Sequence, residues 1–210
     1  MIGLPGQERA APQLAGGLPA DPRNKTLQQA IMDPLPRPRT LIHPGRFNPV
    51  RIRSMHSDRA RHFRLALRPG LSLFEALVEP LAQAGVRNAS TTILGGQFSQ
   101  FRYCVAPPDP SGQTVVAYSE PIHAGATYMV FGNATLGTSV QRRPLVHCHA
   151  TFCLEGREVR GGHVLTEFCV VGPETVSVLV TALDGFELQQ AYDPETNMQL
   201  LQPYEVAINE

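Results

Sequence analysis

Apolar residues recur at helical spacing within residues 71–84. Ser72, followed three residues later by Glu75, predicts a capping box at the start of this segment, and Gly85 predicts its end. The pattern therefore predicts one amphipathic helix, which Pro80 is expected to kink or shorten. The apolar positions that define its buried face are Leu71, Phe74, Leu77, Val78 and Leu81.

Short runs that alternate apolar and polar residues fill most of the remaining chain, and Gly, Pro and Asp separate them. This pattern is typical of strands and tight turns. One helix and about eight following strands predict an α+β domain built on an antiparallel sheet or partial barrel. The predicted strands are His62–Leu67, Ala89–Leu94, Phe98–Val105, Thr114–Tyr118, Ala126–Asn133, Leu145–Leu154, His163–Val171, Thr175–Ala182, Glu187–Ala191 and Met198–Leu201.

The first 60 residues differ from the rest, because they hold nine of the 19 prolines. We expect a mostly irregular Pro/Arg-rich arm over residues 1–60 and a folded domain over residues 61–210. Within the arm, Thr26–Met32 is compatible with a short helix and Val50–Arg53 with an edge strand. We expect residues 36–60 to be more ordered than the beginning of the arm.

The net charge of zero conceals an uneven distribution. Residues 1–68 hold 12 Lys and Arg against 4 Asp and Glu, whereas residues 69–210 hold 6 against 14. The basic arm is expected to pack against the acidic body of its own or a neighbouring subunit, and binding to nucleic acid is the alternative. The chain has no apolar run of membrane-spanning length and no secretory signal, so we expect a soluble, cytoplasmic protein.

Several familiar sites are disfavoured by the motifs. The four cysteines form no Cys-x-x-Cys pair, so we expect reduced, buried thiols rather than a zinc ribbon or a redox site. There is no Gly-x-Ser-x-Gly elbow and no P-loop. The segment Asp193–Asn197 is interpreted as a capped turn before the last strand, in preference to a calcium site.

The strongest chemical signal is a His-x-His pair on a predicted strand. His147 and His149 lie two residues apart within Leu145–Leu154, so their side chains share one face of the strand. Cys148 lies between them and is expected to point to the opposite face. This placement argues against Cys148 as a ligand beside the two histidines.

A third histidine is expected to join this pair. His149 and His163 are equidistant from Gly156, so a hairpin that turns at residues 155–157 pairs them directly. Three imidazoles on one sheet face suit a tetrahedral metal with an open fourth position. A bulge at Gly161-Gly162 would shift this register and move His163 to the other face.

Neutral histidines alone suit zinc, iron, nickel or copper, so they do not identify the element. The alternative interpretation is three ordinary polar or buried histidines. A carboxylate ligand or general base is not assigned, although Glu120, Glu155 and Glu167 are candidates and each is also compatible with a surface charge.

Taken in order, these features resemble the PPC domain (plant and prokaryote conserved, also known as DUF296) over residues 61–203. The residues that carry the resemblance are Leu67-Arg-Pro-Gly70, Gly95-Gly96, Glu120, His147-x-His149 and Gly161-Gly-His163. The resemblance implies an α+β fold around an antiparallel sheet and a homotrimer. It also implies a divalent metal, usually zinc, at the positions of His147, His149 and His163.

Plant members of this family carry AT-hooks that bind A·T-rich DNA. This chain has no Arg-Gly-Arg-Pro core, and Pro36-Arg-Pro-Arg39 lacks the glycine of that motif, so it resembles the prokaryotic type. Cupins also carry a His-x-His strand, but they place a Glu four or five residues after the second histidine, whereas Glu155 comes six after. The later cupin histidine also lies in a more distant motif than His163.

The sequence therefore favours a protein that binds a divalent metal, most simply zinc, through His147, His149 and His163. Its biochemical role is left open. The alternatives are a DNA-associated regulatory protein that uses the basic arm, a metal-dependent enzyme of unknown reaction, and an interaction module without chemistry. A homo-oligomer is expected, and a membrane partner is not.

Overall fold

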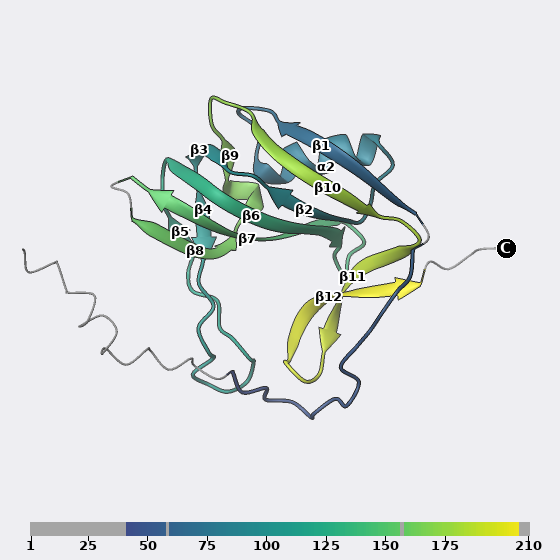
Figure 1. Cartoon of the computed structure of the whole chain (residues 1–210). Helices are drawn as coiled ribbons and strands as arrows, with labels where there is room; N and C mark the ends of the chain where they lie inside the picture. Colours follow the sequence, from purple (N-terminus) through teal and green to yellow (C-terminus); the bar gives the residue numbers. More distant parts are fainter. Residues whose placement is uncertain (1–40, 58, 156–157, 206–210) are drawn as a thin grey trace, which may run out of the picture. The chain divides into compact units, whose positions relative to one another are not determined.

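Antiparallel strands build an open sheet in the computed structural model, which describes residues 41–57, 59–155 and 158–205 (Figure 1). The main path of the sheet has β1 and β5 at its edges, so the sheet is not closed into a barrel. The predicted α+β class with an antiparallel sheet is thereby confirmed. Along this path the strands are β1 (Ala60–Leu67), β10 (Val176–Leu183), β2 (Ala89–Ile93), β6 (Thr127–Thr138), β7 (Pro144–Leu154), β8 (Val159–Val164), β4 (Arg102–Cys104) and β5 (Ile122–His123).

Four further strands branch from this path. β3 (Gly96–Gln100) pairs with β6 and with the short β9 (Val170–Val171). β11 (Phe186–Asp193) and β12 (Met198–Glu205) form an antiparallel hairpin, called the tail hairpin below. The tail hairpin joins the sheet through one parallel pair at the end of β6, so most of its length extends away from the sheet (Figure 1).

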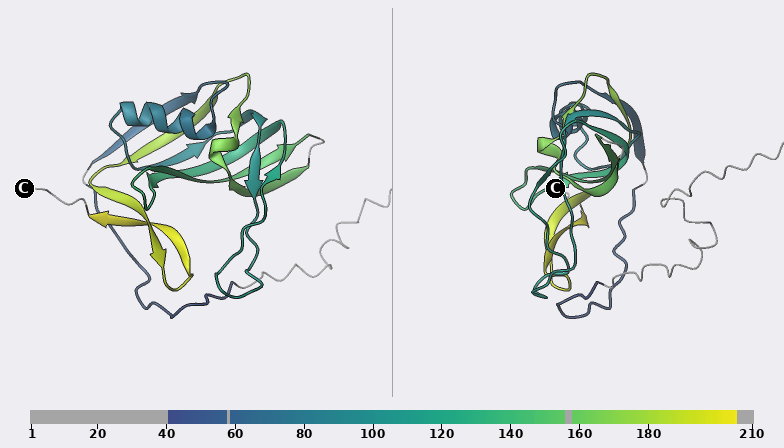
Figure 2. Two further views of the ribbon diagram at one scale, coloured as in Figure 1. Left: turned by 180° about the vertical axis from the view of Figure 1, so that it is seen from behind. Right: turned by 90° about the vertical axis from the view of Figure 1, so that its left-hand side faces the viewer.

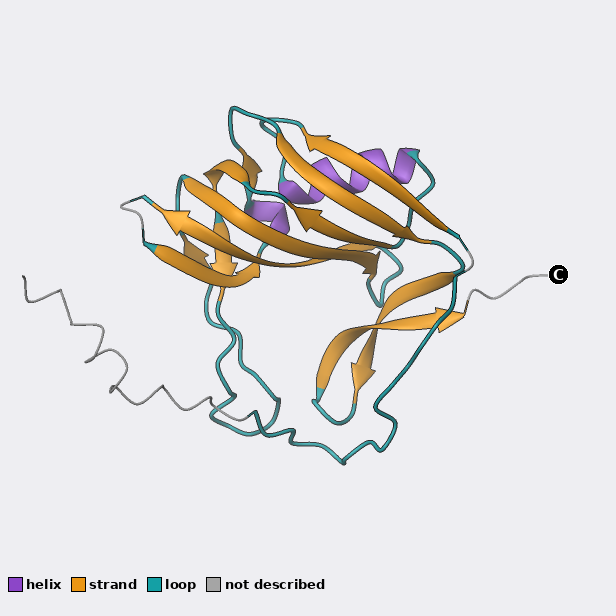
Figure 3. Ribbon diagram, viewed as in Figure 1, coloured by secondary structure: helices purple, strands orange, loops and turns teal. Residues whose placement is uncertain are grey.

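The predicted helix is present as α2 (Leu73–Gln83) and covers one face of the sheet (Figure 3). The backbone N–H of Glu75 donates to Ser72 Oγ at 3.1 Å, and the backbone N–H of Ser72 donates to the Glu75 carboxylate at 3.0 Å. The capping box is thereby confirmed. Gly85 takes a positive φ of 68° just after the helix, and α2 continues through Pro80.

The core lies between α2 and the sheet. Leu73, Leu77 and Leu81 are each no more than 1% exposed, and they share one cluster with buried residues of β10 and β2. Burying one such leucine contributes about 1.5–3 kcal/mol. This packing buries one face of the sheet, and the opposite face remains available for polar side chains.

Three strand predictions are wrong in detail. The run Phe98–Val105 breaks at Phe101 into β3 and β4, and the run His163–Val171 is interrupted by a 3₁₀ turn, η1 (Thr166–Phe168). Thr114–Tyr118 forms no strand, because its neighbours are Pro107 and Pro108, which have no backbone N–H to donate. Only Val116 makes an isolated bridge there.

The part of the arm at residues 41–57, called the strap below, is also irregular. The predicted edge strand Val50–Arg53 is wrong, since these residues join no ladder and use side chains instead of backbone to contact the body. The predicted helix Thr26–Met32 lies outside the described residues. Within the described part of the chain, no helix combines the length and apolar character needed to cross a bilayer.

Two excursions leave the sheet on the side away from α2 (Figure 2). One is the tail hairpin, and the other is the connection between β4 and β5, residues 105–121, called the long loop below. Their tips are tied together, because the backbone N–H of Val115 donates to the Thr196 carbonyl at 3.1 Å and the Asn197 amide donates to the Gln113 carbonyl at 2.8 Å. The excursions therefore form an arch over that side of the sheet.

Candidate metal centre

The alternation along β7 places two histidines on the face away from the core. Cys148 is completely buried, whereas His147 and His149 are exposed on the opposite face. Their neighbours across β6 are Thr135 and Asn133, respectively. The predicted separation of the two imidazoles from the Cys148 thiol is confirmed.

His163 reaches the same face from β8. The register pairs His149 directly with His163, as predicted from their equal distance to residue 156. The ring centroid of His147 lies 4.9 Å from those of His149 and His163, and the last two centroids are 5.4 Å apart. The turn residues 156 and 157 themselves lie outside the described residues. The three side chains, called the histidine triad below, offer ligand atoms that all lie within 4.8 Å of one another.

One atom of the triad is buried without a partner. Nδ1 of His163 is inaccessible to solvent and makes no hydrogen bond with the described residues. A buried, unpaired nitrogen costs free energy unless a ligand or ion satisfies it. Burial, followed by the neighbouring His147 and His149, lowers the pKa of His163 to about 4.

The same physical causes act on His147, although part of its side chain reaches solvent: loss of water around the rest of the ring, and then the neighbouring His149, lower its pKa. His147 and His163 are therefore neutral near pH 7, and a neutral imidazole is the form that ligates a metal. Tetrahedral zinc with Zn–N bonds of about 2.0–2.1 Å needs nitrogens roughly 3.3 Å apart. The ligand atoms of the triad lie within 4.8 Å of one another, so they need to approach by at most about 1.5 Å to reach that separation. The chemistry and geometry of the triad thus fit a divalent transition metal.

Three of the four cysteines, Cys104, Cys148 and Cys169, are buried as predicted, whereas Cys153 is half-buried. Burial, with a further contribution from Cys169, raises the pKa of Cys148 to about 12, so this thiol stays protonated. None of the four cysteines, all of which lie in the described residues, forms a disulfide. His163 on β8 pairs with His149 of β7 on one side and with Cys104 of β4 on the other, and the sequence did not indicate the second contact. Cys104 is buried, and its thiol is not among the ligand atoms that gather within 4.8 Å.

In the described part of the chain, no carboxylate belongs to the group of ligand atoms that lie within 4.8 Å of one another. Of the three predicted candidates, Glu167 at η1 lines a cavity together with His147 and His163, whereas Glu120 and Glu155 do not. Glu167 is therefore the one of these three candidates that borders the same cavity as the histidines.

This cavity, called the triad cavity below, has a volume of about 960 Å³. Its walls come from the sheet, from the long loop and from the tail hairpin. Tyr118 of the long loop stands against the triad, with its ring centroid 5.1 Å from that of His163. The sequence identified the histidines but not the walls, because nothing local in residues 105–121 or 186–205 shows that the two segments meet.

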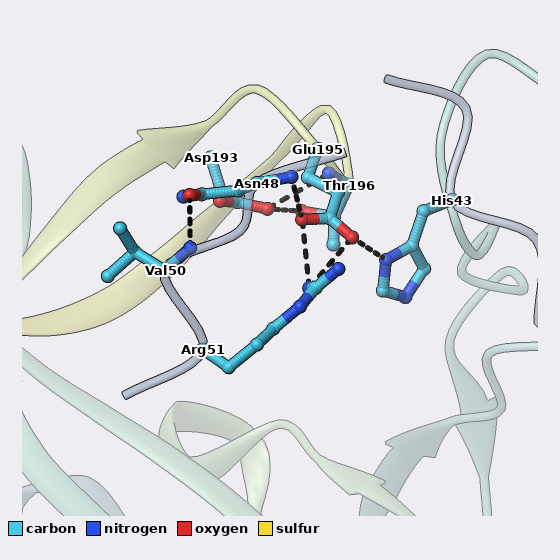
Figure 4. Close-up of polar contacts among 7 residues, drawn as sticks. All are labelled: His43, Asn48, Val50, Arg51, Asp193, Glu195 and Thr196. Carbon is cyan, nitrogen blue, oxygen red and sulfur yellow. Dashed lines mark hydrogen bonds and ion pairs between the residues drawn. The ribbon is translucent and has the colours of Figure 1, made fainter. Parts of the chain in front are cut away.

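A second polar cluster holds the strap against the tip of the tail hairpin (Figure 4). The buried carboxylate of Glu195 accepts from His43 Nδ1 at 2.8 Å, from the backbone N–H of Asn48 at 2.9 Å and from Arg51 Nη1, which lies 3.0 Å from both oxygens. These contacts, with that of His43 the largest, lower the pKa of Glu195 to about 2. The strap therefore packs on an acidic residue of its own chain.

The turn that carries Glu195 is the one predicted for Asp193–Asn197. The Asp193 carboxylate accepts from the backbone N–H of Thr196 at 2.9 Å and from its hydroxyl at 2.6 Å, which confirms a capped turn. The role of Glu195 was not predictable, because its partners lie more than a hundred residues away in the sequence.

An open antiparallel sheet with one helix and a histidine triad on its solvent face defines an α+β protein with a candidate metal centre. The sequence model of the Plants and Prokaryotes Conserved (PCC) domain matches residues 56–184, and the chain belongs to this family. The family resemblance expected from the sequence is thereby confirmed, and the cupin alternative is not supported. None of the curated protein sequences compared with this chain matches it.

Solved structures share the fold at low sequence identity. A metal-containing protein from Archaeoglobus fulgidus is 19% identical, with a TM-score of 0.59, and the match covers 72% of this chain and 99% of that one. A plant- and prokaryote-conserved (PPC) protein from Pyrococcus horikoshii is 16% identical, with a TM-score of 0.54 and coverage of 74% and 99%. A protein named "putative DNA-binding protein" from Ralstonia eutropha JMP134 is 21% identical, with a TM-score of 0.53 and coverage of 66% and 89%.

Proposed function

We propose that this PPC-domain protein binds one divalent metal ion, zinc in the simplest case, through His147, His149 and His163. The observation that carries the proposal is the gathering of three imidazole ligand atoms within 4.8 Å of one another, beside a buried Nδ1 of His163 that has no hydrogen-bond partner among the described residues. The name of the Archaeoglobus protein, which is described as metal-containing, adds support from a protein of the same fold.

The site has three protein ligands and therefore resembles a catalytic or ligand-binding centre more than a closed structural one. A divalent ion held in this way supplies a Lewis acid and lowers the pKa of a bound water towards about 7. Two further expectations belong to the same proposal. The chain assembles as a homotrimer in the cytoplasm, and it divides into an arm at residues 1–60 and a metal-binding domain at residues 61–210.

Metal analysis of the purified full chain tests the proposal. The protein is expected to carry close to one equivalent of metal per chain, and His163→Ala is expected to lose it. His123→Ala is the matched control, because His123 is an exposed histidine on β5 outside the triad. Undiminished metal content in His163→Ala would refute the site, and loss of metal from both variants would point to nonspecific binding by surface histidines.

A second candidate function is association with DNA through the arm. The excess of basic residues in residues 1–68 and the name of the Ralstonia protein both favour it. In that case the full chain binds duplex DNA with an affinity that falls steeply with salt, and deletion of residues 1–60 removes most of the binding. Undiminished binding after the deletion, or no salt dependence, would contradict this candidate.

A further inference from the structure

We propose that the triad cavity binds a small molecule that has one oxygen-donor group for the metal and an uncharged, partly apolar body. This inference rests on the metal site proposed above and adds the class of ligand that the site takes. His147 and His163 both line the cavity, so a metal on the triad borders the same space. The volume of about 960 Å³ lies near the upper end for pockets that enclose small molecules, roughly 300–1,000 Å³.

The charges around the cavity argue for an uncharged body. The lining contains no Lys or Arg, and Glu167 is its single carboxylate. Phosphate groups and other polyanions are normally held by Arg, Lys or a cluster of backbone N–H groups. Without such cations, the metal is the one positive charge available, and it serves one donor group. Nucleotides and nucleic acid are therefore poor occupants of this cavity.

The rest of the lining is suited to a body of mixed character. The tail hairpin contributes Leu188 and Leu201 together with Gln190 and Gln199, which the register and strand alternation place on one face of the hairpin. Neither of these two amides has a hydrogen-bond partner among the described residues, so each is available to a carbonyl or hydroxyl of the ligand.

The sheet and the long loop complete this lining with similar chemistry. Leu145 and Val116 add apolar surface, Thr135 pairs with His147 in the ladder of β6 and β7, and the Tyr118 ring lies 5.1 Å from that of His163. The metal ligands lie on the sheet side of the cavity, whereas the hairpin side presents leucines together with amides. This arrangement suits a ligand with a donor group at one end and a partly apolar body.

The leucine-bearing wall lies outside the residues that the family model matches. The tail hairpin begins at Phe186, beyond residue 184 where the family match ends. Its tip is fixed by the contacts with the long loop and by the Glu195 cluster, so the wall is positioned before a ligand arrives. Preorganised walls of this kind give selectivity for the body of a ligand.

Hydroxamic acids are suitable probes, because they bring an oxygen-donor head to a metal on bodies of different size. The full chain is loaded with Co²⁺, whose visible spectrum reports the metal's ligands without any assay of activity. Benzohydroxamic acid is expected to bind about tenfold or more tightly than acetohydroxamic acid, because its ring is buried against the leucines. Inorganic phosphate is expected to leave the spectrum unchanged at the same concentrations.

Leu201→Arg places a cation on the apolar wall and is expected to abolish the preference for the larger probe. Leu179→Arg is the matched control, since Leu179 is 48% exposed on β10 and does not line the cavity. Gln199→Arg repeats the test at an exposed position that makes no core contact, should Leu201→Arg fail to fold.

The outcomes separate the two proposals. A Co²⁺ spectrum without the triad's signature refutes the metal site itself. A normal spectrum with equal affinity for both hydroxamates, or with a preference that survives Leu201→Arg and Gln199→Arg, refutes the ligand class while the metal site stands. A change of oligomeric state in these two variants, without any probe preference in the wild type, would assign the cavity to a second copy of the chain and also overturn the inference.

Discussion

His149 on β7 and His163 on β8 are directly opposed residues of one antiparallel ladder, with ring centroids 5.4 Å apart. Gly162, the residue before His163, lets β8 fit between β7 and β4. A Cβ on Gly162 would lie 2.6 Å from the Cys104 carbonyl oxygen and 2.8 Å from a ring carbon of Tyr103, so only glycine allows β4 to approach this closely. Gly161 has no such constraint, since its Cβ would meet its nearest atom, the Ala150 carbonyl oxygen, at 3.4 Å.

These two glycines make a matched pair of variants. Gly162→Ala is expected to lower the free energy of unfolding by about 1–3 kcal/mol, because a backbone contact below 3.0 Å forces β4 and β8 apart. It is also expected to weaken metal binding, because His163 moves with β8. Gly161→Ala is expected to change both quantities little. Chemical denaturation and metal titration check this, and similar behaviour of the two variants would contradict the packing described.

Cys148 provides a second test, because it lies between two triad histidines in the sequence and on the opposite face of the sheet. Cys148→Ala is expected to retain full metal content and to cost modest stability, on the order of 1 kcal/mol for the small volume lost in the core. Metal analysis and denaturation are the measurements. Loss of the metal from a folded Cys148→Ala protein would show that the thiol is a ligand.

Local patterns in the sequence were enough to predict the helix, most strands and the triad. The helix followed from its capping box and apolar spacing, and the triad followed from strand alternation together with a hairpin symmetric about residue 156. Both features depend on residues close together in the chain. Where the prediction failed, as at Thr114–Tyr118, β-favouring residues lacked a partner strand with free N–H groups.

The cavity and the Glu195 cluster could not be predicted in this way. Val115 and Thr196 meet through backbone atoms, which leave no trace in the side-chain pattern. Glu195 meets His43 and Arg51 only because the strap passes the tip of the tail hairpin (Figure 4). Such contacts are set by the tertiary path of the chain, and one sequence does not encode them locally.

The Glu195 cluster predicts a specific dependence of stability on pH. The pKa of Glu195 falls from 4.5 to about 2 in the folded protein. A lowered folded pKa means that the carboxylate stabilises the fold above about pH 4.5, and that this contribution is lost as the pH falls towards 2. Glu195→Gln is expected to flatten the stability curve in this window, relative to wild type.

The surface variant Glu174→Gln is the control for that comparison, because Glu174 is exposed and lies outside the cluster. Thermal unfolding between pH 2 and 5 is the measurement. If the stability of wild type and Glu195→Gln changes with pH in parallel, ionisation of Glu195 does not contribute to the stability of the fold.

The core under α2 is expected to be separable from the metal site. Leu77→Ala removes a side chain that is 1% exposed and should cost about 2–5 kcal/mol, the range for a leucine cavity in a packed core. The folded fraction should still bind metal with unchanged stoichiometry, because α2 packs on the face opposite the triad. Loss of metal from folded Leu77→Ala protein would instead show that packing under α2 is coupled to the metal site on the opposite face of the sheet.

X-ray absorption at the edge of the bound metal reports directly on the ligands of the histidine triad. For zinc, we expect nitrogen or oxygen neighbours at about 2.0–2.1 Å, with the outer-shell scattering of three imidazoles and no sulfur at about 2.3 Å. The same spectrum of His163→Ala should lose one imidazole or show no bound metal. A sulfur neighbour, or an unchanged spectrum in His163→Ala, would contradict the assignment of the metal to His147, His149 and His163.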